Sequence, residues 1–494
     1  MKLLRRLFRV LSGLLLVILV AGGATLAWLS TDHARAWLFD ALPGALQTQG
    51  VRLQIGQSRG SLLGNLRLQD VEVEVAGHRV TVERLRLHWR PRALMARRLH
   101  IVEIAAEGVN ADIAAEAPSD APTALSLPDM VLPLDIAIDR LALDRVLATQ
   151  AAADWQLDHL HAVVRADADG LALPELAVGL PGIALSGSAA VQPRVPHKLD
   201  ARLTLRVGRN VTGDAIGDTL TRLQVQGPAL QPALLLQVAE PATVRIEGDL
   251  DLTPRVPLID LVLEAPVLDW PLQGARQVRL TDSRFRLAGA IDDYRLQGSA
   301  SLEPTSLPPL GLTLAATGGL ESADVDSLRL DTLDGQVDVR GRFGWHQGLD
   351  WRFTVEAADL DPSQIDAAWP GRIGGSLNVS GEMGRPGGEA MAWDAELLDL
   401  GGTLRGYPVN ARGVASQSGD RLSVRDVRLR SGLNRLDLDG AVMPGLALSM
   451  TLEAPGLDQV HPGFNGRLHG RADLGGTLER PHGEIRLDGE GVVF

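Results

Sequence analysis

Apolar and polar residues alternate with a period of two along most of this chain. Between residues 51 and 89 the apolar positions include Val51, Leu53, Ile55, Leu66, Leu68, Val71, Val73, Val75, Val80, Val82, Leu85, Leu87 and Trp89. Arg, Gln, Glu, Thr and His lie between them. Such alternation predicts β-strands with one apolar and one polar face. The same pattern predicts strands at 199–207, 244–252, 294–302, 337–343, 377–379 and 433–438.

Turns and short helices are expected between these strands. Gly, Asp, Asn or Pro separates most of the apolar runs, as tight turns require. Asp361-Pro362 opens a helical stretch that ends at Trp369, because Asp is a good N-cap and Pro suits the first helical position. Two further helical stretches are predicted at 32–42 and 91–99. Asp292-Asp293 is predicted to form a hairpin turn before Tyr294.

The N-terminus predicts the compartment. Residues 1–9 hold four basic and no acidic side chains, and residues 10–29 are an uncharged, mostly aliphatic run. Twenty helical residues span ~30 Å, the thickness of a bilayer core. The basic flank stays in the cytoplasm, so we expect a single-pass anchor in a bacterial inner membrane, with residues 30–494 in the periplasm. A cleaved signal peptide is the alternative, with Ala34-Arg35-Ala36 as a cleavage site, although its apolar region would be ~7–15 residues.

Composition excludes several classes of protein. The formal net charge is −13, which argues against nucleic-acid binding because that needs a basic surface. Cysteine is absent, which rules out disulfides, iron–sulfur clusters, cysteine zinc sites and a thiol nucleophile. We expect no cofactor and no metal. His159 and His161 share a strand face but lack a third ligand.

Domain limits follow from composition. Four prolines within residues 118–133 predict a linker or edge segment at 116–133. It separates an N-terminal β unit at 30–115, which contains a short helix, from a long β region at 134–494. Residues 356–381 and 453–476 form a weak internal repeat in which Glu356 corresponds to Glu453 and Trp369 to His461. A repeat of this size favours a stacked, one-dimensional architecture. The second copy ends in a strand-like run without a cap, which suggests a fragment or a covered end.

The apolar face of such a chain has to be buried. It can face a second sheet, fill a closed β-helix, or line an open groove along the sheet. An open groove suits acyl chains, because apolar burial is favourable while polar headgroups stay in water. The residues expected to line it are Val71, Val73, Val75, Leu85, Leu87, Val337, Val339, Leu436 and Leu438.

Arginines cluster close to the predicted anchor. They are Arg84, Arg86, Arg90, Arg92, Arg97 and Arg98. One interpretation is a solvated strand face. The other is contact with anionic lipid headgroups, to which each Arg near the surface contributes ~1 kcal/mol.

Residues 331–383 carry a resemblance to a known family. The matching features are Gly341-Arg342 with Trp345, Leu349-Asp350-Trp351, Asp359-Leu360-Asp361-Pro362, and Trp369-Pro370-Gly371 before a Gly-spaced strand. The match continues through Leu404-Arg405-Gly406-Tyr407-Pro408. Together they resemble the repeat of the TamB family, the inner-membrane component of the translocation and assembly module. The resemblance covers essentially the whole chain, without the family's C-terminal domain, and so indicates an N-terminal portion.

The resemblance implies both fold and function. The family belongs to the AsmA-like group of bridge-like lipid transporters, which implies an elongated repeat-type β-sheet folded into an open groove (a β-taco) behind one transmembrane helix. It implies phospholipid conduction from the inner to the outer membrane. A rival role is a scaffold for outer-membrane protein insertion or autotransporter secretion with a TamA-like barrel partner, in which a β edge templates an incoming strand. No catalysis is expected. A polysaccharide-acting β-helix enzyme would need an aromatic, acid-lined cleft, and aromatic residues are only 4%.

Overall fold

A computed structural model describes residues 51–61, 63–75, 78–113, 134–150, 153–384, 391–461, 463–477 and 479–493. The predicted anchor at 10–29, the basic segment at 1–9, the helix at 32–42 and the linker at 116–133 lie outside these residues. No helix within the described ranges is long and apolar enough to cross a membrane.

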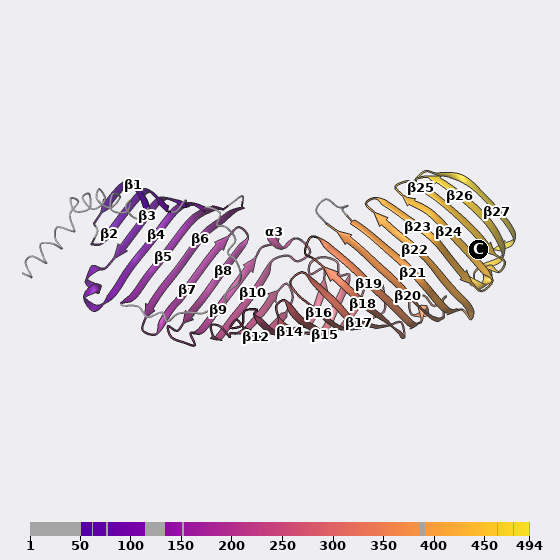
Figure 1. The fold of residues 1–494 in the computed structure, drawn as a ribbon, viewed down its shortest axis with the longest axis horizontal. Coiled ribbons are helices and arrows are strands. Elements are labelled where there is room, and N and C mark those ends of the chain that lie inside the picture. Colours follow the sequence, from indigo (N-terminus) through magenta and orange to yellow (C-terminus); the bar gives the residue numbers. More distant parts are fainter. Residues whose placement is uncertain are drawn as a thin grey trace, which may run out of the picture. The chain divides into compact units, whose positions relative to one another are not determined.

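The chain divides into two compact units. The first comprises Met1–Pro241 with Leu250–Arg255, and the second Ala242–Asp249 with Val256–Phe494. Within each unit the strands lie side by side in a row (Figure 1). The limits predicted from composition at residues 115 and 134 stay predictions, and the strands on either side of them are neighbours in the sheet.

The strands of the first unit are β1 (Val51–Gly60), β2 (Asn65–Val75), β3 (His78–Trp89), β4 (Arg98–Ile113), β5 (Asp135–Gln150), β6 (Ala153–Asp167), β7 (Gly170–Leu180), β8 (Ile183–Val191), β9 (Lys198–Val207), β10 (Thr219–Pro228) and β11 (Ala233–Glu240). Each pairs with the next along the chain. All of these pairings are antiparallel except that of β4 with β5, which is parallel. The parallel pairing of β4 with β5 therefore interrupts an otherwise antiparallel series of hairpins.

The strands of the second unit are β12 (Val244–Asp251), β13 (Leu258–Trp270), β14 (Val278–Ala290), β15 (Asp293–Pro304), β16 (Leu310–Gly318), β17 (Ser322–Thr332), β18 (Gly335–Gly344), β19 (Leu349–Leu360), β20 (Gly371–Met383), β21 (Met391–Leu404), β22 (Tyr407–Ser418), β23 (Arg421–Ser431), β24 (Asn434–Met443), β25 (Leu446–Ala454), β26 (Asn465–Gly476) and β27 (Pro481–Val493). From β13 to β27 every successive pair is antiparallel. The predictions of a mainly β fold and of strands at the alternating runs are confirmed.

The predicted helical stretches are shorter in the structure. Residues 91–99 form a six-residue 3-10 helix, η1 (Pro91–Ala96), and then enter β4. The stretch at 361–369 holds only the 3-10 turn η2 (Pro362–Gln364), although Asp361 caps it as predicted, accepting a hydrogen bond from Ser363 N at 3.0 Å. The residues after η2 form turns up to the start of β20. The sequence did not predict η3 (Leu457–Gln459) or the single helical turn α3 (Arg209–Thr212). A hairpin turn precedes Tyr294 as predicted, but it is formed by Ile291 and Asp292, one residue earlier than expected, and Asp293 begins β15.

Three aspartates interrupt the regular pairing of neighbouring strands in the second unit. Asp282, Asp359 and Asp426 have φ values of 51°, 57° and 50°. Each lies where the pairing register shifts. Asp tolerates this left-handed conformation better than most residues, and a bulge bends its strand and increases the local twist. The strands of the second unit are therefore bent at several places along the row.

Few side chains are fully buried. The buried hydrophobic residues are mostly alanines, and among the described residues no large side chain is below 2% exposed. One small cluster of Leu66, Leu68 and Val71 is buried in the first unit, with Ile55, Val73, Val82, Leu85 and Leu87 packed against it. The largest buried side chains of the first unit therefore lie on one face of the sheet, while small alanines such as Ala105 and Ala142 are buried on the other.

Candidate functional site

Two rows of apolar side chains cross the first unit on one face. The pairing registers place the members of each row directly opposite one another from strand to strand. One row consists of Leu68, Leu85, Ala106, Leu143, Leu160, Val178, Leu185, Leu205, Thr221 and Val238. The other consists of Leu66, Leu87, Ile104, Leu141, Ala162, Leu176, Gly187, Leu203, Leu223 and Leu236. A nearly unbroken apolar strip, two residues wide, thus runs from β2 to β11.

The second unit carries an equivalent strip. One row, from β16 to β27, consists of Leu312, Leu330, Val337, Ala357, Gly375, Leu400, Ala411, Leu429, Leu436, Leu452, Gly470 and Leu487. The row beside it contains Leu328, Val339, Val355, Leu377 and Leu397, and continues past the register shift at Gly413 with Val427, Leu438, Met450 and Ala472.

The predicted lining residues fall on these strips. Val337 and Leu436 share one row of the second unit, although they are 99 positions apart in the chain, and Val339 and Leu438 share the adjacent row. Leu85 and Leu87 belong to the two rows of the first unit. Val71 and Val73 lie on the same face, where Val71 is buried. The side chain of Val75 lies outside the described part of the structure.

Sequence reasoning missed most members of both strips. Leu141, Leu143 and Leu160, for example, lie in the same rows as Leu85 and Leu87. The sequence shows that these residues alternate with polar ones. It does not show that they align across strands, because the alignment depends on the pairing register.

No second layer of described structure covers the apolar strips. The main contacts of each described strand are with its sheet neighbours and with the 3-10 turns η1, η2 and η3. Most strip side chains are accordingly half-buried, and some are more open: Leu429 is 38% exposed and Leu487 is 58% exposed. Large exposed apolar surfaces on soluble domains mark sites that bind apolar partners or ligands.

The opposite face is polar and largely neutralised by cross-strand ion pairs. Arg279 holds Asp269 through two hydrogen bonds at 2.7 and 3.0 Å, and Arg286 holds Asp260 at 2.8 and 2.6 Å. These guanidinium hydrogen bonds lower the pKa of both aspartates below the ordinary value. The two faces of the sheet thus differ sharply in polarity.

The arginines predicted to contact headgroups differ in their surroundings. Arg84 pairs with Glu107 at 2.5 Å, and Arg145 reaches Glu107 at 3.0 Å. Arg98 lies 3.7 Å from Asp135. In the described ranges no carboxylate pairs with the remaining four, which are Arg86, Arg90, Arg92 and Arg97. These four are exposed.

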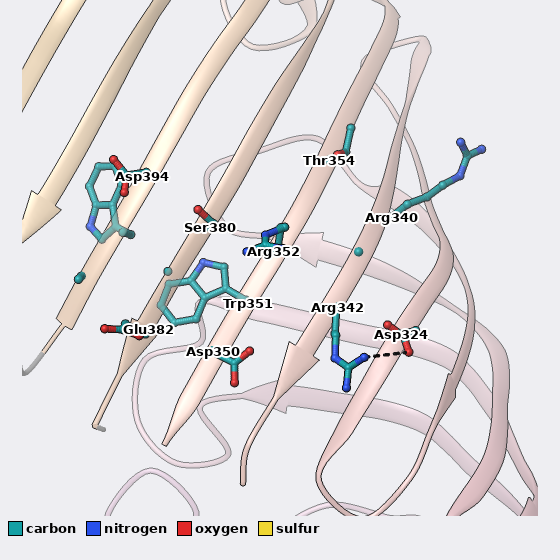
Figure 2. Close-up of a pocket in the computed structure, with 14 residues that line it drawn as sticks. Asp324, Arg340, Arg342, Asp350, Trp351, Arg352, Thr354, Ser380, Glu382 and Asp394 are labelled. Carbon is teal, nitrogen blue, oxygen red and sulfur yellow. Dashed lines mark ion pairs between the residues drawn. The ribbon is translucent and has the colours of Figure 1, made fainter. Parts of the chain in front are cut away.

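A shallow hollow of about 710 Å³ lies over the polar face of strands β17 to β21. Its lining includes Arg340, Arg342 and Arg352 together with the acidic residues Asp324, Asp350, Glu382 and Asp394. Figure 2 shows Arg342 directed toward Asp324, an ion pair of 3.9 Å. Three basic and four acidic side chains leave this hollow close to neutral, so it has no strong preference for an ion.

Histidines do not assemble a metal site in the described segments. The rings of His159 and His161 lie 5.4 Å apart, and His161 Nε2 lies 3.3 Å from Asp144. No group of three or more His, Asp or Glu side chains with metal-binding geometry occurs in the part of the chain that the structure describes.

Comparison with known proteins gives one family. The family model described as "TamB, N-terminal domain" matches residues 114–494. A curated relative, the translocation and assembly module subunit TamB of Haemophilus influenzae, is 24% identical over 214 residues. That alignment covers 42% of this chain and 16% of the relative, so the chain matches only a small part of that protein's length. No solved structure matches.

Proposed function

The chain belongs to the TamB N-terminal domain family, and on that premise we propose that it conducts phospholipids from the inner toward the outer membrane along its apolar strips. The observation that carries the proposal is the continuity of the strips. In each unit, apolar residues face one another from strand to strand without a covering layer of described structure. The proposal involves no catalysis.

Acyl chains suit such a surface. Transfer of each CH₂ from water to an apolar surface contributes ~0.8 kcal/mol, so a two-chain lipid is retained firmly. Successive strands offer nearly equivalent leucine and valine contacts at ~4.8 Å intervals. A lipid can therefore move between neighbouring positions without leaving the apolar surface, while its headgroup remains in water.

In this proposal each unit's sheet curls around its apolar strip into an open groove, the β-taco expected from the family. The bulges at Asp282, Asp359 and Asp426 support curling, because they bend strands that would otherwise be straight. The proposal also includes anchoring by residues 10–29 in the inner membrane, a periplasmic location for the sheet, and a TamA-like barrel partner in the outer membrane.

A second candidate function follows from the relative's name. The H. influenzae protein is a subunit of the translocation and assembly module, so this chain could act as a scaffold for outer-membrane protein insertion or autotransporter secretion. In that role the apolar strips would be an ordinary core, and transport of lipid would not depend on them.

Charged substitutions on the strip test the proposal. Val337→Glu and Leu438→Arg, made in the full-length protein in cells that lack the native copy, place a charge in the path of the acyl chains. We expect loss of phospholipid delivery to the outer membrane. The matched control is Thr354→Glu, which places the same charge on the exposed polar face of β19 and should leave delivery intact.

The two candidate functions predict different results. If folded Val337→Glu and Leu438→Arg proteins deliver phospholipid normally, the conduit proposal is wrong. If these variants deliver lipid but fail to support insertion of outer-membrane proteins, the scaffold function is correct. Circular dichroism of the purified variants establishes that each remains folded.

A further inference from the structure

Three arginines face one another across the first three strands. The β1–β2 register pairs Arg59 with Arg67, and the β2–β3 register pairs Arg67 with Arg86. They lie on the face opposite Leu66, Leu68, Leu85 and Leu87, and all three are exposed. We call Arg59, Arg67 and Arg86 the arginine row. Like charges directly opposite each other in a sheet are destabilising, so this arrangement costs stability.

Carboxylates do not neutralise the row. Among the described residues none of its three members pairs with an acidic side chain. The nearest acidic positions on this face are engaged elsewhere. Glu107 pairs with Arg84 and Arg145, and Glu103 lies 3.8 Å from Arg140. Within the described residues, the arginines of the row therefore keep their positive charges without a carboxylate partner.

In each of the other facing arginine pairs of the described ladders, at least one arginine pairs with a carboxylate. Arg342 faces Arg352, and Arg342 pairs with Asp324 at 3.9 Å. Arg430 faces Arg435, which pairs with Asp437 at 2.7 Å.

Two more pairs follow the same rule. Arg412 faces Arg428, which lies 3.6 Å from Asp426. Arg471 faces Arg486, and Arg471 lies 3.5 Å from Asp473. The arginine row thus departs from the pattern that holds along the rest of the described sheet.

We infer that the arginine row is a docking surface for acidic phospholipid headgroups at the membrane. A guanidinium binds phosphate oxygens through paired hydrogen bonds, and three in a line can engage several phosphates at once. The row is an exposed strip on a strand face and not a cavity, which suits an extended anionic surface. The exposed arginines Arg90, Arg92 and Arg97 follow in and around η1, directly after β3, and enlarge the basic area.

The position of the row along the chain supports a membrane as its partner. Arg59 follows the proposed anchor at 10–29 by only 30 positions. Docking would hold the first strands against the bilayer where lipids enter the apolar strip. The inference rests on the membrane location in the proposed function, and not on lipid transport itself.

A single label can test docking because the natural chain contains no cysteine. Asn65→Cys places a fluorophore on the exposed end of β2, two residues from Arg67. The full chain is reconstituted in vesicles of phosphatidylcholine alone or with acidic phosphatidylglycerol, each containing a lipid with a quencher on its headgroup. We expect strong quenching only in acidic vesicles, which weakens at high salt because salt screens exposed charges.

The decisive variant replaces all three members of the row: Arg59→Gln, Arg67→Gln and Arg86→Gln. Docking should weaken by about 100-fold, taking about fivefold for each arginine near an anionic surface. The control replaces three exposed arginines of β23, by Arg421→Gln, Arg425→Gln and Arg430→Gln. It changes the net charge equally and should leave docking unchanged.

Three outcomes would overturn the inference. Equal quenching of the wild-type and row variants would show that the row does not dock. An equal loss in the β23 variant would show that only net charge matters. A change in the fluorescence of the label on addition of millimolar inorganic phosphate, without quenching by acidic vesicles, would show that the row binds a free anion. Because none of these readouts measures lipid delivery, each can fail while the conduit proposal stands.

Discussion

Trp369 and His461, at matching positions of the two repeated segments, lie with their ring centroids 6.2 Å apart. They belong to the loops after β19 and β25, and His461 also contacts Phe464 at 4.8 Å. Hydrogen bonds from Arg405, in the turn between β21 and β22, join both loops. Arg405 N donates to Pro370 O, and Arg405 Nη1 donates to Asp458 O at 2.6 Å. The sequence repeat is thus also a spatial contact, which ties together one edge of the second unit.

A double-mutant cycle measures the Trp369–His461 contact. Aromatic pairs at such distances contribute ~0.5–1.5 kcal/mol beyond burial, so we expect Trp369→Ala and His461→Ala to be coupled by that amount in denaturant unfolding. Trp345→Ala combined with His461→Ala is the control, because no contact joins those rings, and should be additive within ~0.5 kcal/mol. Additivity of the Trp369 pair would mean that the loops are not joined through these rings.

Asn434 anchors η3 to the sheet. It is 5% exposed, its Nδ2 donates to Gly456 O at 2.8 Å, and its Oδ1 accepts from Gly456 N at 3.1 Å. Asn434→Ala leaves buried backbone groups without partners, and we expect a loss of ~1–3 kcal/mol in the free energy of unfolding. The exposed Asn465→Ala should change it by less than ~0.5 kcal/mol. Similar values for both variants would contradict the anchoring role.

Replacement of Arg67, in the middle of the arginine row, by an acidic residue is expected to increase the stability of the protein. Arg67→Glu replaces two like-charge contacts by two opposite-charge contacts, which should stabilise the protein by ~0.2–1 kcal/mol. Arg52→Glu is the control. Arg52 pairs with Glu74 at 3.3 Å, so this change creates repulsion and should destabilise. Thermal unfolding of the two variants would contradict the account if Arg67→Glu lowered the melting temperature.

Acid sensitivity should depend on Asp139. Its hydrogen bond with His100, at 2.8 Å, and its contacts with Arg165 lower the pKa of the carboxyl below its ordinary value of 3.8. The carboxylate therefore stabilises the fold above that ordinary pKa, and the contribution is lost as pH falls through the lowered value. Asp139→Asn should give a flatter dependence of unfolding free energy on pH below about 4. A profile identical to that of wild type would show that Asp139 does not contribute.

Local features of the fold could be predicted from the sequence. Strands such as β9 and β18 follow from alternation, because each strand has one apolar and one polar face. Asp361 was identified as a cap because capping depends on neighbouring residues alone. The helices predicted at 91–99 and 361–369 contain only 3-10 segments, η1 and η2.

Features that depend on strand register could not be predicted. Arg59 and Arg67 were not recognised as partners of Arg86, since only the pairing brings the three together. For the same reason, the sequence did not show that Val337 and Leu436 share one row. The bulges at Asp282, Asp359 and Asp426 were also missed, because an Asp in an alternating run carries no distinct signal for a left-handed conformation.

The most direct test of the lipid conduit is photo-crosslinking in living cells. A benzoyl-phenylalanine is introduced at Val337 or Leu438 on the apolar strip, and at the neighbouring positions Asp338 or Asp437, whose side chains alternate to the opposite face. The account predicts phospholipid adducts at Val337 and Leu438 and none at Asp338 or Asp437. Adducts to outer-membrane proteins, with no lipid at any of the four positions, would contradict it and would identify the sheet as an assembly scaffold.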